Sequence, residues 1–250
     1  MLVAFEYLAG AYFLLIGVLG PFSGAPARRP PVVSLTAFGL AASIAAVTRL
    51  LTVDARAWIG HLYLAAGYWL PALLVTRPPG AFDAWLRKTE PAAARNLWIS
   101  GHLAELAYLC CYPLVPAAFI TVYTTGSIAD VDRFWTSVLG AGFLCYISLP
   151  WLVSRPPRII EDAIVDVSPV RHINLHVLDR FSHGWNTFPS GHVAVAVAAA
   201  LSVVSVAPHA GVAFLIVAAG IVVGSVSGRY HYTIDALAGI IVGLGASLIP

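Results

Sequence analysis

The chain of 250 residues is 59% hydrophobic and only 10% charged, with a mean hydropathy of +0.83. A single soluble core of this length could not bury so much apolar surface, which argues against an ordinary soluble domain. A net charge of +2 without a run of Lys or Arg argues against nucleic-acid binding. The three cysteines lie inside apolar stretches and indicate neither a disulfide framework nor a zinc site. The composition therefore predicts an integral membrane protein.

Apolar stretches long enough to cross a bilayer recur along the chain. A transmembrane helix needs about 20 mostly apolar residues. No internal repeat or appended soluble domain is evident, so we expect a single membrane domain over 1–250. The sequence predicts an all-α polytopic helix bundle of about eight spans, near residues 3–20, 33–53, 57–76, 98–123, 134–153, 190–207, 211–228 and 232–249.

Eight spans would place the polar connections on one face and both termini on the other. The connections on that shared face are 21–32, 77–97, 154–189 and 229–231. They carry more Lys and Arg than the connections of the opposite face. The positive-inside rule then predicts that the shared face points to the cytoplasm.

The segment TFPSGH (187–192) marks the point where a polar loop becomes an apolar helix. Ser190 is placed as an N-cap, and Gly191 leaves backbone N–H groups accessible, which favours an anion site at the helix start. His192 could hydrogen-bond a phosphate oxygen or protonate a leaving oxygen near neutral pH. The alternative interpretation is a capped helix start beside an interfacial histidine.

The segment GRYHYTID (228–235) joins the last two predicted spans at the same face. His231 and Asp235 are four residues apart, so on a helix they share one side. The carboxylate can accept the imidazole N–H and leave the other ring nitrogen free to act as a nucleophile. A carboxylate inside an apolar stretch is costly without a partner, which favours a functional pair. The alternative is a structural pair that closes a helix hairpin.

The segment SRPPR (154–158) follows the fifth predicted span, again on that face. The guanidinium groups of Arg155 and Arg158 suit a phosphoryl centre because they stay charged and donate in a planar fork. The alternative is that these arginines only anchor the chain at the membrane interface.

In this order, the three segments resemble the type 2 phosphatidic acid phosphatase superfamily over residues 134–245. The resemblance implies a six-helix core and a site that uses neither a metal nor another cofactor and works through a phosphohistidine. It also implies that His231 is the nucleophile, that Asp235 orients it and that His192 protonates the leaving oxygen. The phosphate cradle would then consist of Arg155, Arg158, Ser190, Gly191 and Arg229.

Two positions depart from the common pattern of this family. A Lys is usual seven residues before the first Arg-Pro, where this chain has Ser148, and an Arg is usual six residues before the nucleophilic His, where it has Ser225. Arg229 could replace the second of these cations. The Arg-Pro-Pro-Arg form and the His-Tyr-x-x-Asp form resemble the branch of inositol phosphotransferases and sphingolipid synthases.

The sequence thus predicts a membrane phosphatase acting on a lipid phosphate or pyrophosphate that enters from the bilayer. A phosphotransferase that passes the phosphoryl group to an alcohol is the first alternative. A transporter, or a noncatalytic protein that binds anionic lipid, is a further one.

Other polar residues are interpreted more simply. Glu105 lies three residues after a histidine in the fourth stretch, which favours a satisfied interhelical pair over a proton relay. His172 and His176 have helical metal-ligand spacing, but a third ligand is missing, so their segment is interpreted as an amphipathic interfacial helix. His183, just before the main motif, could contact substrate or belong to the interfacial aromatic belt.

Overall fold

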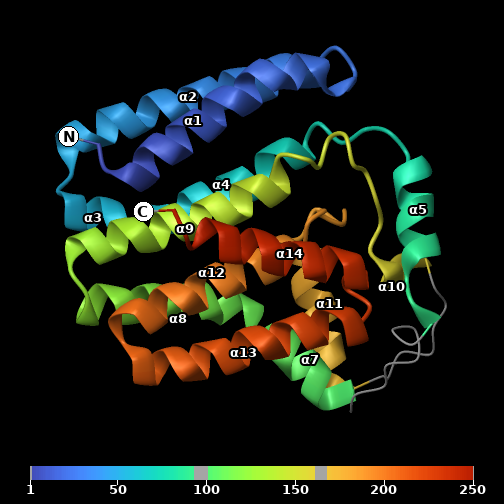
Figure 1. Cartoon of the computed structure of the whole chain (residues 1–250). Coiled ribbons are helices and arrows are strands. Elements are labelled where there is room, and N and C mark those ends of the chain that lie inside the picture. Colours follow the sequence, from blue (N-terminus) through green and yellow to red (C-terminus); the bar gives the residue numbers. More distant parts are fainter. Residues whose placement is uncertain (1, 93–100, 161–167, 250) are drawn as a thin grey trace.

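The computed structural model describes residues 2–92, 101–160 and 168–249, and Figure 1 shows them as a bundle of helices. Within these residues no strand forms, and one isolated bridge joins Ser154 to Asn186. The all-α prediction is confirmed. The elements are α1 (Ala4–Leu19), η1 (Gly20–Ser23), α2 (Arg29–Leu50), α3 (Val53–Ala57), α4 (Gly60–Ala72), α5 (Ala81–Thr89), α7 (Gly101–Leu109), α8 (Cys111–Thr125), α9 (Ile128–Tyr146), α10 (Pro157–Ile160), α11 (Pro169–Phe181), α12 (Gly191–Val206), α13 (Pro208–Ser227) and α14 (Thr233–Ala246).

Each of the eight predicted stretches contains a helix, but the helices differ in length. By length and composition, α1 with η1, α2 and α13 qualify as membrane spans, and α7 with α8 would form a fourth span bent by 46°. α12 and α14 are apolar but have only 16 and 14 residues. They are about 24 and 21 Å long, shorter than the roughly 30 Å hydrocarbon core. The described helices therefore support three or four spans, and the count of eight stays a prediction.

α12 lies at the centre of the bundle and packs against α8, α9, α13 and α14 (Figure 1). Its many alanines let the neighbouring helices approach closely, and Ala194 and Ala198 are completely buried. α14 contributes two glycines to this contact. A Cβ on Gly239 would lie 2.7 Å from the Ser190 carbonyl oxygen, and one on Gly243 would lie 2.6 Å from that of Ala194. These two glycines set the distance between α12 and α14.

The N-terminal helices form an outer layer in which α2 packs on α1, and α1 packs on α9 and α4 (Figure 1). A buried ion pair with an N–O distance of 2.7 Å joins Glu6 of α1 to Arg56 of α3. The Asp132 carboxylate accepts hydrogen bonds from two backbone N–H groups at the start of α1. Glu6, Arg56 and Asp132 are therefore paired at this end of the bundle.

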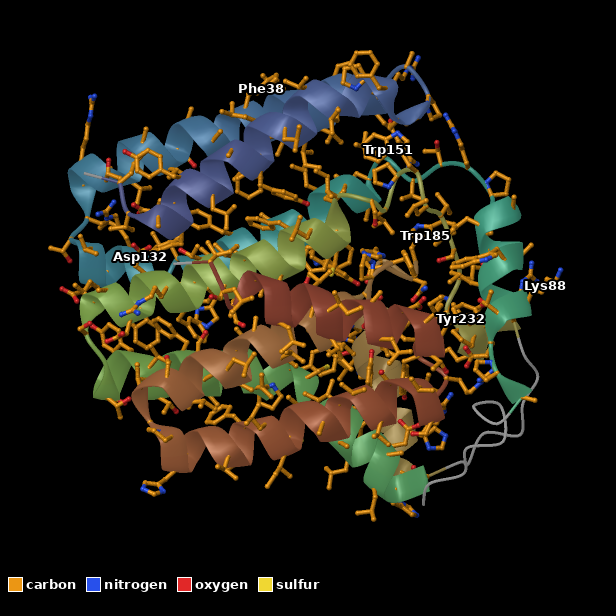
Figure 2. All side chains as sticks on the ribbon, viewed as in Figure 1. Phe38, Lys88, Asp132, Trp151, Trp185 and Tyr232 are labelled. Atoms are coloured by element: carbon orange, nitrogen blue, oxygen red, sulfur yellow. The ribbon has the colours of Figure 1, made fainter. Side chains whose placement is uncertain are left out.

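The described parts of the predicted polar connections lie at the opposite end of the bundle. α5, α10 and the turn between α13 and α14 lie there, whereas both termini lie at the end that holds Asp132 (Figures 1 and 2). Trp185 and Tyr232 mark this same end beside α5 (Figure 2). The three motif segments lie together at this end of the bundle, and the membrane face that it meets stays a prediction.

The close contact between α12 and α14 gives a test with a matched control. Gly243→Ala should lower the free energy of unfolding by about 1–3 kcal/mol, because the new methyl group collides with the α12 backbone. Gly245→Ala, on the same helix with no atom within 4 Å of its Cβ, should be neutral or slightly stabilising. Thermal unfolding of the purified protein in detergent measures both, and equal effects would contradict the packing described here.

Candidate active site

Hydrogen bonds at the start of α12 hold the loop that precedes it. The Ser190 Oγ accepts a hydrogen bond from an N–H of the first helical turn, and the Ser190 N–H donates to the Asp235 carbonyl oxygen at 3.1 Å. The Thr187 Oγ1 accepts the Gly191 N–H at 3.2 Å. A Cβ at Gly191 would collide with the Tyr146 ring. Ser190 and Gly191 thus shape the helix start, and the Gly191 N–H that was expected to be open to an anion is already bonded.

The turn between α13 and α14 carries His231. The Ser225 carbonyl oxygen accepts the N–H groups of both Tyr230 and His231 at 2.9 Å. Arg229 has a φ of 61°, a left-handed conformation that costs a residue with a side chain about 1–2 kcal/mol. The chain therefore reverses direction at Arg229 and brings His231 to the start of α14.

Asp235 is completely buried and lies near three nitrogen atoms. Its Oδ2 accepts hydrogen bonds from Asn186 Nδ2 at 2.7 Å and from the Tyr232 N–H at 3.1 Å, and it lies 3.5 Å from His231 Nδ1. His231 Nδ1 makes no hydrogen bond to any described residue. The predicted helical pair is wrong in one respect, because α14 begins at Thr233 and His231 lies before it. The separation of His231 and Asp235 is that of a loose ion pair. The shortest hydrogen bond to the Asp235 carboxylate comes from Asn186, a residue that the sequence did not identify.

The two histidines of the motifs meet at a small polar cavity. The ring centroids of His192 and His231 are 5.8 Å apart. Both rings line a cavity of about 20 Å³ together with Asn186 and Arg158. Two imidazoles at this separation can contact one small group from different sides, which is the arrangement that a nucleophile and a general acid require.

The three predicted arginines lie in different environments. Arg158 is half-buried, lines the polar cavity and has no carboxylate within ion-pair distance among the described residues. Burial lowers its pKa, but a guanidinium group remains charged in proteins. Arg155 is exposed, and Arg229 is buried with its guanidinium 3.4 Å from Glu90 Oε1. Neither of these two lines the cavity.

α5 and the residue that follows it contact all three motif segments, which the sequence did not predict. The Asp83 carboxylate accepts the Arg155 N–H at 2.9 Å, and an α5 phenylalanine ring lies 5.2 Å from the Phe188 ring. Glu90, which follows α5, accepts the Thr233 N–H at 2.9 Å as well as the Arg229 guanidinium. Burial raises the pKa of the Glu90 carboxyl. α5 therefore connects the segments that carry the predicted site.

A buried network links α7 and α11 to the turn that carries His231. The Glu105 carboxylate accepts hydrogen bonds from Arg171 Nη1 at 2.6 Å, Asn174 Nδ2 at 2.6 Å and the Tyr230 hydroxyl at 2.5 Å. The prediction of a satisfied interhelical pair at Glu105 is confirmed. The spacing of Arg171 and Asn174 on one side of α11 was the signal that could have identified the partner.

The remaining histidines lie outside the polar cavity. His172 and His176 are on the exposed side of α11, and within the described residues no group of three His, Cys, Asp or Glu side chains could hold a metal ion. The His183 ring stacks on Tyr68 at 4.2 Å between centroids, and its Nδ1 accepts the Trp185 N–H. Burial lowers the pKa of His183 to about 4.

A larger apolar cleft adjoins the polar cavity. It has a volume of about 380 Å³ and runs between α4, α8, α11 and α12. Its wall includes Leu64, Val115 and Val195, and five residues line both spaces. Because His192 is one of those five, a molecule could place a charged group between the histidines and an apolar chain in the cleft. The shared residues are Tyr68, Leu178, Ser182, Thr187 and His192.

The family model described as the PAP2 superfamily matches residues 81–249, more than half of the chain. The chain belongs to the PAP2 superfamily. No curated protein and no solved structure gives a significant match. The PAP2 match begins at α5, ahead of the region 134–245 in which the motifs were found. PAP2 membership indicates a phosphatase-type activity on lipid phosphates, and the apolar helices are compatible with an integral membrane protein.

The two positions that depart from the common PAP2 pattern have structural roles in this chain. The Ser148 hydroxyl donates to the Phe188 carbonyl oxygen at 2.5 Å and so holds the loop before α12. The Ser225 hydroxyl donates to the Val222 carbonyl oxygen at 2.8 Å, within α13. Ser148 therefore supports a motif segment, and neither serine contributes a positive charge. Among the described residues, Arg158 is the cation that lines the polar cavity of this PAP2 protein.

The half-buried His183 predicts a pH dependence of stability. Its pKa falls from the ordinary 6.5 to about 4 on folding, so between these values the unfolded chain binds a proton that the native protein does not. The free energy of unfolding should therefore decrease as the pH falls from 6.5 to 4, by about 1–3 kcal/mol, with no contribution above 6.5. His183→Phe keeps a ring on Tyr68 and should remove this decrease. Unfolding of the wild type and His183→Phe in detergent across this pH range tests the prediction. An equal decrease in the free energy of unfolding of both proteins would contradict it.

Proposed function

We propose that the protein is an integral membrane lipid-phosphate phosphatase that works through a phosphohistidine on His231. The observation that supports this proposal is the junction of the two cavities at His192. The polar cavity offers two imidazoles and the guanidinium of Arg158, and the cleft beside it is apolar. A phosphorylated lipid has the same division into an anionic head and an apolar chain.

In the first step, His231 Nε2 attacks phosphorus, a P–N bond forms, and the P–O bond to the lipid breaks. His192 gives its proton to the departing oxygen. Asp235 lies nearer to Nδ1 and keeps the proton on that nitrogen, so Nε2 carries the lone pair. A separation of 3.5 Å can shorten when substrate binds. Arg158 stabilises the negative charge on the equatorial oxygens.

In the second step, water attacks the phosphohistidine. His192, now neutral, accepts a proton from this water, the P–N bond breaks, and inorganic phosphate leaves. The cycle returns both histidines to their starting states. No metal or other cofactor takes part in the proposed steps.

The apolar cleft supports entry of the lipid from the bilayer. The exposed side chains of α4 and α8 beside it include Leu62, Trp69 and Ile120, so an acyl or prenyl chain can stay in an apolar environment while its phosphate reaches His192. The excess of Lys and Arg in the connections at this end supports a cytoplasmic site.

A phosphotransferase is the second candidate, and one observation favours it. Arg158, and not Arg155, lines the polar cavity. Arg158 is the second arginine of the Arg-Pro-Pro-Arg form, which resembles the phosphotransferase branch. The two candidates share the first step and differ only in whether water or an alcohol attacks the phosphohistidine.

The acceptor can be identified by product analysis. The purified protein is incubated, with EDTA present, with labelled phosphatidic acid, a prenyl pyrophosphate, or a phosphatidylinositol donor plus ceramide or diacylglycerol. Release of free phosphate supports the phosphatase, and a labelled phospholipid product supports the transferase. Absence of every product would exclude both and leave a noncatalytic lipid-binding protein.

Replacement of the nucleophile provides the central test of the mechanism. His231→Ala should lower turnover of the best substrate by at least about 10³-fold, because the phosphohistidine cannot form. His176→Ala, on the exposed side of α11, is the control and should leave turnover unchanged. The rate of phosphate release is measured for both variants. Unchanged turnover in His231→Ala would exclude the proposed mechanism.

The two motif arginines should differ in their effect on activity. Arg158→Ala should lower kcat/KM by about 10²-fold, because it removes the cation that lines the polar cavity. Arg155→Ala should change it only a few-fold, since that side chain is exposed. Initial rates at several substrate concentrations give kcat/KM for both variants. A larger loss in Arg155→Ala than in Arg158→Ala would show that Arg155 contacts the phosphoryl group instead.

A further inference from the structure

The guanidinium of Arg158 lies over an aromatic ring. Its central carbon is 5.3 Å from the Tyr230 ring centroid, and the Arg158 backbone N–H donates to the Arg229 carbonyl oxygen at 2.9 Å. The described part of the chain places no carboxylate within ion-pair distance of it. A cation–π contact can fix the place of a guanidinium without neutralising its charge. Arg158 can therefore be positioned and still attract an anion.

Tyr230 is held firmly enough to serve as this platform. Its side chain is buried, and its ring stacks on the Tyr108 ring with centroids 3.7 Å apart and planes within 6°. Its hydroxyl donates to the Glu105 carboxylate at 2.5 Å. The ring thus has a packed neighbour and a hydrogen bond at its polar end, which together limit its rotation.

A second guanidinium lies at the same distance from this ring. The central carbon of Arg171 is also 5.3 Å from the Tyr230 centroid, but Arg171 is paired with Glu105 at 2.6 Å. Arg171 also donates to the Gly228 carbonyl oxygen at 2.8 Å. Glu105 therefore compensates one of the two cations around the ring. Without Glu105, the charge of Arg171 would repel Arg158.

We infer that Tyr230 and Glu105 are positioning residues for Arg158. Tyr230 supplies the surface against which the guanidinium lies, and Glu105 fixes that ring and compensates Arg171. The ligand of Arg158 is then the phosphoryl group, so the inference rests on the proposed function for the identity of the ligand. A network that only stabilised the fold would not act through Arg158.

A double-mutant cycle on phosphate binding separates these two roles. Binding of inorganic phosphate is measured as the rise in thermal stability with phosphate concentration, which requires no turnover. The proteins are the wild type, Tyr230→Leu, Arg158→Ala and the double variant. Tyr7→Leu is the control, because Tyr7 is an exposed tyrosine on α1.

Tyr230→Leu should weaken phosphate binding about 3–30-fold, the range expected when a partly desolvated cation–π contact is lost. In the Arg158→Ala background the same substitution should have almost no further effect, and Tyr7→Leu should have none. An equal loss in both backgrounds, or no loss in either, would overturn the inference.

Two conservative variants keep the test decisive if Tyr230→Leu fails to fold. Tyr230→Phe keeps the ring and loses only the bond to Glu105, so it should weaken phosphate binding less than Glu105→Gln, which also removes the charge opposite Arg171. Both losses should disappear in the Arg158→Ala background, and losses that persist there would overturn the inference. The two proposals can fail separately. If phosphate binding shows the coupling between Tyr230 and Arg158 but no lipid phosphate is turned over, the proposed function is wrong and this inference is still supported.

Discussion

The close contact between α12 and α14 is the constraint on which the site depends. Gly239 and Gly243 allow the α14 backbone to approach the carbonyl groups of α12, and any side chain there would separate the two helices. Packing of small residues is an effective way to join helices where water supplies no hydrophobic driving force. The Ser190 N–H and the Asp235 carbonyl oxygen bond across this contact. The starts of the two helices are thereby joined, and the imidazoles of His192 and His231, which lie beside them, reach one cavity.

Burial of charge decides how the remaining polar groups are arranged around this cavity. A buried carboxylate is costly unless donors surround it. Glu90 is bonded by Thr233 and Arg229, Glu105 by a donor set on α11 and the turn, and Asp235 by Asn186. A carboxylate or guanidinium that is bonded in this way is not available to bind a substrate. The arrangement leaves Arg158 with its charge directed to the polar cavity.

The region that matches the PAP2 superfamily begins at α5, and the contacts of α5 and α7 give a physical reason for that boundary. Carboxylates of these two segments bind the arginine segment, the start of α14 and the turn between α13 and α14. Removing α5 and α7 would leave buried cations and N–H groups without their partners. The motif segments therefore depend on two helices, α5 and α7, that contain none of them.

The sequence by itself determined the all-α membrane chain, the helix starts near Ser190 and Thr233, and the gathering of the three motifs at one end of the bundle. These features depend on hydropathy and local spacing, which are properties of short segments. Only the tertiary structure decided which arginine lines the cavity, that Asn186 makes the short bond to Asp235, and that Glu105 is bonded to Arg171 and Tyr230. Such pairings depend on distances between segments that are remote in sequence. An arginine side chain is long enough to reach several partners, so local spacing alone cannot choose among them.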